Sequence, residues 1–170
     1  MRVVSFVAAR SNSGKTTLIE KIVGVLKARG LRVAVIKHAS AGFELDRPGK
    51  DSWRFERAGA DAVVLVGPDR MAILKKLDRE PTAAELLRAA PDADIVIYEG
   101  FKQTAINKIE VFRQGVSGTA PLCASDGSYL ALVSDRPFPV AIPRFDLNDV
   151  DGIAAFIATQ ATVFPLHDAR

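Results

Sequence analysis

The chain has 170 residues, of which 48% are hydrophobic, and its formal net charge at pH 7 is +3. This length and apolar content can bury one sizeable core, so we expect a single compact domain. The mild basic excess is spread along the chain without a clustered stripe or interleaved aromatic residues, which argues against nucleic-acid binding and fits a polyanionic ligand or an acidic protein partner.

Two further features limit the class of protein. Cys123 is the only cysteine, so the chain cannot form an internal disulfide or a multi-cysteine metal site. No apolar run approaches the length of a membrane span. We therefore predict a cytoplasmic protein that is not embedded in a membrane.

The first segment, residues 3–18, reads VVSFVAARSNSGKTTL. Its apolar start predicts a strand, a small polar loop follows, and Gly-Lys-Thr leads into a helical pattern. This order is typical of the phosphate-binding loop of nucleotide triphosphatases. The motif asks for glycine at the position of Ala9, so the loop is expected to begin with a less strained turn. The alternative, an ordinary exposed turn at a helix start, does not account for this placement.

The residue types in this loop suit phosphate chemistry. Small residues let successive backbone N–H groups turn inward and form a cradle for phosphate oxygens. Lys15 would reach the terminal phosphates, and the Thr16 hydroxyl would occupy one position on Mg²⁺. The N-terminus of the following helix adds a partial positive charge aimed at the same anion.

Apolar periodicity predicts α/β structure in the rest of the chain. A helix is expected from Lys15 to Arg29, closed by Gly30, and a buried strand over residues 31–37. The polar segment 39–51 is predicted to be a functional loop. The later elements are a helix over 53–58, a hairpin of strands 62–66 and 71–76, a helix from Thr82 to about Ala90 stopped by Pro91, strands at 94–98, 108–113, 129–133 and 139–142, and a helix from near Asn148.

These elements predict one P-loop NTPase domain over residues 1–160 and a C-terminal tail over residues 161–170. The central sheet should be mostly parallel, with helices on both faces and an added antiparallel hairpin or edge strands. The alternating strand 108–113 is expected at the sheet edge. The segment 114–128 is rich in Gly, Ser and Pro and is expected to be a loop.

Glu99 follows the apolar strand 94–98 and precedes Gly100. Ligands bind at the carboxyl ends of strands in open α/β sheets, and Gly100 would let the backbone approach a γ-phosphate. A carboxylate here can bind Mg²⁺ directly, bind it through water, or orient an attacking water, so we predict Lys15 and Glu99 as the catalytic residues. The alternative is a strand-end acid that faces solvent.

Three other side chains are further candidates. Asp51 lies where a switch segment would sense the γ-phosphate, and we predict it as a metal ligand, although Asp is also a preferred helix N-cap. His38 follows the second strand and could contact phosphate or substrate, but a lone His at a strand end is more often structural. Lys102 follows Gly100 and is expected to point into the same crevice.

Asp135 follows the late strand 129–133 within the tetrapeptide Ser-Asp-Arg-Pro. At this position guanine-specific enzymes accept hydrogen bonds from the N1–H and the exocyclic amine of the base, whereas adenine has no donor at N1. On residue types alone, an Asx turn before proline is the better explanation.

With these segments assembled, the chain resembles the molybdopterin-guanine dinucleotide biosynthesis protein B family, the GTP-binding accessory proteins of molybdenum cofactor biosynthesis. The linked pair GKDS and EGFK is more specific than the phosphate loop alone, and the family carries alanine at the position of Ala9. The matching segments occur in family order up to about residue 158: AARSNSGKTTL, VIKHA, DRPGKDSWRFERAGA, DIVIYEGFK, KIEVFR, LVSDRP and DLNDVDGIAAFI.

The resemblance implies GTP binding with Mg²⁺, weak hydrolysis, a homodimer and partnership with the guanylyltransferase that joins GMP to molybdopterin; direct binding of molybdopterin stays open. It assigns Asp135 to guanine, Thr16 and Glu99 to Mg²⁺, and, by a weaker match, Asp51 to the metal. It assigns six residues to the phosphates of the nucleotide: Asn12, Ser13, Gly14, Lys15, Thr16 and Thr17.

Three functions agree with these residues. The first is an accessory GTP-binding protein with weak GTPase activity. The second is a small-molecule kinase in which Glu99 or Asp51 acts as the base for a substrate hydroxyl. The third is an adaptor that does not hydrolyse nucleotide. In such an adaptor, either a bound nucleotide controls binding of the partner, or the loop only stabilises the fold.

Overall fold

The computed structural model describes residues 1–40, 42–43, 46–90 and 92–164. The chain divides into two compact units, a first unit of Met1–His38 with Ala83–Arg170 and a second unit of Ala39–Thr82. The predicted boundary between a domain over residues 1–160 and a tail over residues 161–170 stays a prediction, and residues 165–170 lie outside the described ranges.

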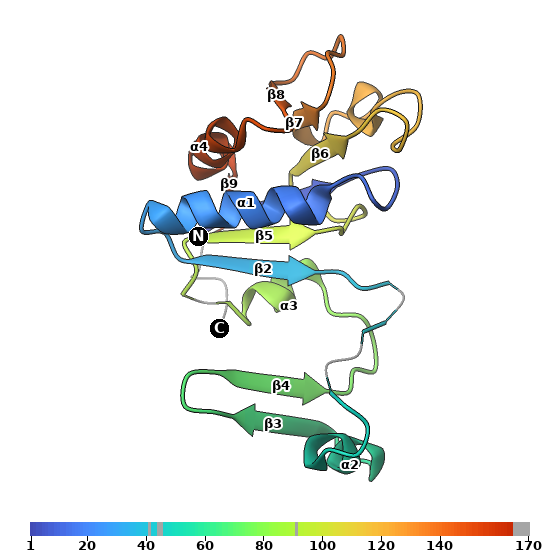
Figure 1. Cartoon of the computed structure of the whole chain (residues 1–170), viewed down its shortest axis with the longest axis vertical. Helices are drawn as coiled ribbons and strands as arrows, with labels where there is room; N and C mark the ends of the chain where they lie inside the picture. Colours follow the sequence, from blue (N-terminus) through green and yellow to red (C-terminus); the bar gives the residue numbers. More distant parts are fainter. Residues whose placement is uncertain (41, 44–45, 91, 165–170) are drawn as a thin grey trace. The chain divides into compact units, whose positions relative to one another are not determined.

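Seven strands of the described residues form the sheet of the first unit: β1 (Arg2–Val7), β2 (Val33–Lys37), β5 (Ile95–Glu99), β6 (Lys108–Phe112), β7 (Tyr129–Ser134), β8 (Arg144–Asp146) and β9 (Thr162–Val163). Their order is β2-β5-β1-β6-β7-β8, and all neighbours along this path are parallel (Figure 1). The short β9 pairs antiparallel with the start of β1. The predicted mostly parallel sheet is confirmed.

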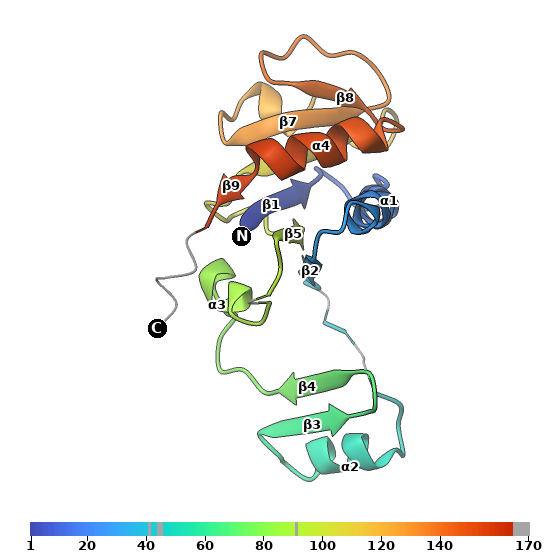
Figure 2. The same ribbon diagram turned by 90° about the vertical axis from the view of Figure 1, so that its left-hand side faces the viewer.

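Helices cover both faces of this sheet, as predicted. α1 (Lys15–Ala28) and α4 (Val150–Gln160) share one core with the strands, in which Ile22 is fully buried. α3 (Ala83–Leu87) packs on the other face, where Leu87 belongs to a second core. Figure 2 shows α1 and α3 on opposite sides of β2 and β5. Each helix buries its apolar stripe against the sheet, which is what holds these layers together.

The helix boundaries lie within a few residues of those predicted. α1 ends at Ala28, and Gly30 follows with a φ of +79°, the left-handed conformation that glycine adopts without strain. α4 begins at Val150 because the Asp149 carboxylate caps it by accepting from the Gly152 N–H. α3 ends at Leu87, earlier than predicted, and the expected stop at position 91 lies outside the described residues.

The prediction that strand 108–113 lies at the sheet edge is wrong. β6 lies between β1 and β7, and all of its residues are buried. The Lys108 ammonium donates to Ser128 Oγ at 3.0 Å. The Glu110 carboxylate accepts from the N–H groups of Leu122 and Cys123 at 2.9 and 2.8 Å. Charged residues that alternate along a strand indicate an edge strand only where their side chains reach water. Here the side chains of Lys108 and Glu110 make hydrogen bonds within the protein instead.

The prediction of a strand over residues 139–142 is also wrong. The strand after β7 is β8, three residues long and parallel to β7. Pro139 and Pro143 have no N–H group and cannot donate to a strand ladder. The carbonyl of Pro143 accepts from the Leu132 N–H at 2.9 Å, so pairing with β7 starts only at this point. The segment 114–128 is irregular as predicted, apart from one 3₁₀ turn.

The second unit contains α2 (Asp51–Arg57) and a hairpin of β3 (Ala62–Val66) and β4 (Met71–Lys75). The predicted antiparallel hairpin is confirmed. α2 begins at Asp51, two residues earlier than predicted, and its N-cap residue is Lys50, without a side-chain hydrogen bond. The alternative role of Asp51 as a helix N-cap is therefore wrong.

Candidate nucleotide-binding site

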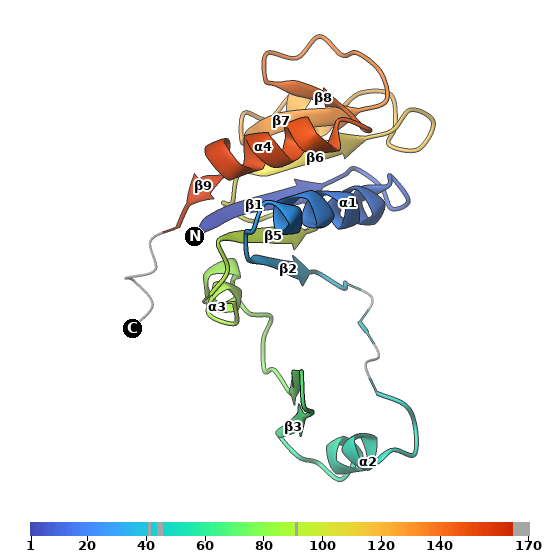
Figure 3. The same cartoon turned by 60° about the vertical axis from the view of Figure 1, so that its left-hand side comes forward.

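The predicted phosphate loop connects β1 to α1 at the edge where the parallel strands end (Figure 3). Asn12 and Gly14 have left-handed backbones, with φ values of +61° and +87°, whereas Ala9 does not, as expected for alanine at that position. Ser13 is 1% exposed, and its hydroxyl has no hydrogen-bond partner among the described residues. A buried hydroxyl without a partner costs free energy. An oxyanion held in the loop would supply the missing acceptor.

Lys15 stands at the start of α1, half buried. Burial lowers the pKa of its ammonium group, the charge of Glu99 acts in the opposite direction, and the charges of Lys102 and Lys37 lower the pKa further. Three ammonium groups and one carboxylate therefore share one electrostatic environment. A phosphate would relieve the repulsion between the ammonium groups, and such perturbed groups are typical of functional sites.

Glu99 is the last residue of β5, and its side chain is 11% exposed. Its Oε1 accepts a hydrogen bond from Thr16 Oγ1 at 2.5 Å. Its Oε2 lies 3.9 Å from Lys37 Nζ. The alternative of a solvent-facing acid is therefore wrong. The structure brings the end of β5 and the start of α1 together, as the predicted roles of Thr16 and Glu99 require.

The turn after Glu99 lies against the phosphate loop. Gly100 has a φ of +100°, and a Cβ there would lie 3.3 Å from the Cβ of His38. Phe101 also adopts a left-handed backbone, with a φ of +52°, which is strained for a bulky residue. The Lys102 ammonium donates to the carbonyl of Ala9 at 3.0 Å, so it contacts the phosphate loop. Strain of this kind gathers at functional sites.

His38 makes contacts that agree with a structural role. Its backbone N–H donates to the backbone carbonyl of Glu99 at 3.0 Å. Its ring centroid lies 5.1 Å from that of Phe101. These contacts hold the ends of β2 and β5 together, and a contact of His38 with a ligand stays a prediction.

Asp135 follows β7 and is exposed. Both of its carboxylate oxygens accept from the N–H of Gln114, at 3.0 and 3.1 Å. The turn after β7 is instead closed by the Ser134 hydroxyl, which donates to the carbonyl of Arg136 at 2.6 Å. The Asx-turn explanation is therefore wrong, because the carboxylate is directed to the segment that follows β6.

Sequence reasoning missed Arg113, the first residue after β6. A Cβ built on Gly14 would lie 3.2 Å from Arg113 Nη2, so the guanidinium rests against the phosphate loop. The position of Arg113 at the end of a strand could have identified it, as the same kind of position identified Glu99. Both residues stand at the C-terminal end of an apolar strand, at the edge where ligands bind.

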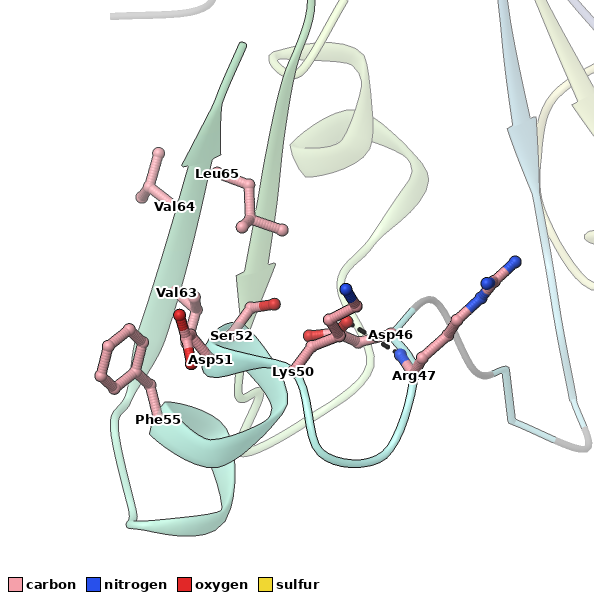
Figure 4. A pocket seen from close by; sticks show the side chains of 9 residues that line it. All are labelled: Asp46, Arg47, Lys50, Asp51, Ser52, Phe55, Val63, Val64 and Leu65. Carbon is pink, nitrogen blue, oxygen red and sulfur yellow. Dashed lines mark hydrogen bonds between the residues drawn. The ribbon is translucent and has the colours of Figure 1, made fainter.

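Asp51 belongs to the second unit. Its side chain is 85% exposed, and its carboxylate lies 3.8 Å from a guanidinium nitrogen of Arg54 in the same helix. It lines an open groove of about 640 Å³, together with cationic side chains such as Arg47 and Lys50 and apolar ones such as Phe55 (Figure 4). Its role as a metal ligand stays a prediction.

Three further findings concern the residues that the structure describes. No three His, Cys, Asp or Glu side chains among them form a metal cluster. Cys123 is half buried, and burial raises the pKa of its thiol to about 12, so the thiol is protonated near neutral pH and is a poor nucleophile. None of the helices in the described ranges combines the length and apolar composition needed to span a membrane.

The family model described as molybdopterin guanine dinucleotide synthesis protein B, MobB, matches residues 3–135, more than half of the chain. The chain belongs to the MobB family. The matched region runs from β1 to Asp135, so it contains the phosphate loop, Asp51 and Glu99.

Two relatives carry the name molybdopterin-guanine dinucleotide biosynthesis adapter protein. That of Haemophilus influenzae is 39% identical over 163 residues, which cover 94% of this chain and 89% of the relative. That of Escherichia coli K12 is 36% identical over 154 residues, which cover 88% of each. A crystal structure of molybdopterin-guanine biosynthesis protein B matches with a TM-score of 0.72 at 30% identity, covering 91% of this chain and 97% of that one.

This MobB chain is therefore an adapter protein of molybdopterin guanine dinucleotide biosynthesis, with the P-loop NTPase fold predicted from its sequence. Its phosphate loop lies between two flanking groups. Glu99 stands at the end of one neighbour of β1, and Arg113 follows the other. Asp135 follows β7, one strand further along the sheet.

Proposed function

We propose that this MobB chain binds GTP together with Mg²⁺, hydrolyses it slowly, and in this form assists the guanylyltransferase that attaches GMP to molybdopterin. The observation that carries the proposal is the hydrogen bond between Thr16 and Glu99 beside the phosphate loop. It joins the helix start and the strand end from which P-loop proteins support the metal of a bound nucleotide.

The loop has the features that a triphosphate needs. The left-handed backbones of Asn12 and Gly14 let N–H groups point to one side, as in an anion-binding nest. The buried hydroxyl of Ser13 would donate to a phosphate oxygen. The ammonium groups of Lys15 and Lys102 would balance the negative charge.

The residues present fit Mg²⁺. Hydroxyl and carboxylate oxygens are its ordinary protein ligands, and it needs only one or two of them beside phosphate and water. Thr16 and Glu99 would hold the ion, and Asp51 is kept as a further proposed ligand. When bound, Mg²⁺ would neutralise charge on the β- and γ-phosphates.

The variant Glu99→Gln should weaken the effect of Mg²⁺ on GTP affinity by about tenfold, because it keeps the side-chain shape and an oxygen for Thr16 but removes the negative charge. GTP affinity without Mg²⁺ should not fall, since Lys37, whose ammonium lies 3.9 Å from Glu99 Oε2, loses this carboxylate and becomes available to phosphate. Calorimetry with and without Mg²⁺ measures both affinities. Glu20→Gln on the exposed side of α1 is the control. A Mg²⁺ dependence equal to that of wild type would rule Glu99 out as a ligand.

Asp135 supports the choice of GTP over ATP. Each carboxylate oxygen has two lone pairs, so the hydrogen bonds from Gln114 leave acceptors for the N1–H and the amine of guanine. Adenine offers no donor at N1 and would leave the carboxylate without a partner.

The variant Asp135→Asn should reduce the ratio of GTP to ATP affinity by about tenfold. The carboxylate of Asp135 has two acceptor oxygens, whereas the amide of asparagine has one acceptor oxygen and an NH₂ donor. Competition of ATP against a fluorescent GTP analogue measures this ratio. Asp92→Asn, an exposed change before β5, is the control. An unaltered ratio in the Asp135 variant would remove this residue from base recognition.

We also propose that the chain forms a homodimer. Val64 and Val66 pair in register with Ile73 and Met71, so all four side chains lie on one face of the hairpin. They are between 55% and 78% exposed. A two-stranded sheet is marginal alone, and an apolar face of this kind is typical of protein contacts, so a second copy is a suitable cover. Sedimentation equilibrium of the full chain tests this state.

Calorimetry of GTP and ATP, each with and without Mg²⁺, tests the proposed function as a whole. We expect tight binding of GTP and slow hydrolysis in a single turnover. ATP preference with phosphate transfer to an added acceptor would favour the small-molecule kinase instead. If neither nucleotide binds, the loop serves only the fold. Co-purification with the guanylyltransferase, with and without GTP, tests the partner.

A further inference from the structure

Arg113 places its guanidinium against the phosphate loop. Its Nη2 would lie 3.2 Å from a Cβ on Gly14. Within the described residues this guanidinium has no hydrogen bond, ion pair or aromatic contact, although it carries five N–H donors. Two other arginines of the first unit pair with carboxylates, Arg29 with Asp151 and Arg32 with Asp94. Among the residues that the structure describes, the Arg113 guanidinium is thus a cation without a partner at the loop.

The backbone of Arg113 is held firmly. Its N–H donates to Ser117 Oγ at 3.0 Å, and its carbonyl accepts from the N–H of Ser117 at 2.9 Å. Ser117 is 3% exposed, and Phe112, the residue before Arg113, is 1% exposed. The next N–H, that of Gln114, is taken by Asp135. Because the backbone on both sides of Arg113 is held by these hydrogen bonds, the Cα of Arg113 has a defined position beside the loop.

The topology puts Arg113 on the opposite flank of the loop from Glu99. β1 leads into the loop, and its two neighbours in the sheet are β5, which ends at Glu99, and β6, which precedes Arg113. The Glu99 flank holds Thr16 and Lys37 and suits the metal and the terminal phosphate. On the other flank Arg113 stands beside Gly14 and next to the segment that Asp135 binds.

We propose that Arg113 binds the phosphate chain of the nucleotide from the β6 side of the loop, an inference that rests on the proposed function. Loop N–H groups of this motif cradle the α- and β-phosphates, whereas the motif lysine reaches the β- and γ-phosphates. Since the Arg113 guanidinium lies against Gly14, it would contact the α- and β-phosphates, which GTP and GDP share. A guanidinium suits this task because its planar donors match phosphate oxygens in pairs.

The test compares GTP and GDP affinities of wild type, Arg113→Ala and Arg113→Lys by calorimetry. Arg113→Ala should weaken both nucleotides by about tenfold and by the same ratio, the effect of one charge-assisted phosphate contact at an exposed position. Arg113→Lys should recover part of the loss, because it keeps the charge without the paired donors. Arg88→Ala, an exposed arginine between α3 and β5, removes the same charge elsewhere and should leave both affinities unchanged.

Three outcomes would overturn the role of Arg113. If wild type binds GTP and Arg113→Ala binds both nucleotides equally well, Arg113 makes no phosphate contact. If only GTP binding is weakened, the contact is with the γ-phosphate and the assigned flank is wrong. If thermal stability falls while the affinities hold, Arg113 only braces the loop. A wild-type chain that binds neither nucleotide would overturn the proposed function, and this inference with it.

Discussion

Lys15→Ala should lower the affinity for GTP by about 100-fold and leave the fold intact. The ammonium group is half buried beside the loop, in an environment that it shares with Lys37, Lys102 and Glu99. Removing it deletes a charge-assisted contact to phosphate worth about 3 kcal/mol, which corresponds to about 100-fold in affinity. Alanine favours helices, and no hydrogen bond of the Lys15 side chain exists within the described residues to be lost.

Calorimetry of GTP binding and a thermal unfolding curve measure the two halves of this prediction. Lys21→Ala, on the exposed side of the same helix, removes an equal charge and should bind GTP as wild type does. The stability of Lys15→Ala should stay within about 0.5 kcal/mol of wild type. GTP binding that survives the loss of Lys15 would count against the whole site, since Lys15 is the motif residue that should reach the terminal phosphates.

Glu110→Ala should lower the free energy of unfolding by about 3 kcal/mol, the largest stability effect that we expect from a single polar side chain. The carboxylate of Glu110 is fully buried and accepts from the N–H groups of Leu122 and Cys123. Alanine would leave both donors without an acceptor and would open a cavity in β6. Because β6 supports Arg113, this loss should be accompanied by looser nucleotide binding.

Urea denaturation measures the loss. Glu110→Gln should fall between wild type and Glu110→Ala, because the amide keeps one acceptor oxygen but turns an N–H₂ group toward a backbone donor. Glu20→Ala on the surface of α1 is the control and should change stability by less than about 0.5 kcal/mol. A loss in Glu110→Ala as small as that of the control would mean that water satisfies the two N–H groups.

Local patterns account for the parts of the fold that were predicted correctly. The apolar residues of α1 repeat at helical spacing. The helix ends just before Gly30, whose left-handed backbone lets the chain turn away from the helix axis. The apolar runs of β1 and β5 are buried on both sides, as strands inside a parallel sheet must be. Glu99 was found because it follows such a run, and the structure brings it to Thr16.

Errors arose where a residue's partner is distant in the chain. The charges of Lys108 and Glu110 suggested an exposed strand, yet their partners lie 20 and about a dozen residues away and bring them into the interior. Asp135 looked like a turn residue until its contact with Gln114, 21 residues earlier, became visible. No periodicity reports such pairings, because each depends on which polar group happens to be near once the sheet has formed.

The phosphate-loop motif, most of the helices and strands, and the family could be inferred from the residues alone, since each depends on short-range spacing and on residue type. Strand order, the position of β6 beside β1 and the approach of Arg113 to Gly14 came only from the folded chain. The reason is physical: backbone conformation follows from neighbouring residues, whereas contacts between distant segments follow from burying the apolar faces together while every buried polar group finds a partner.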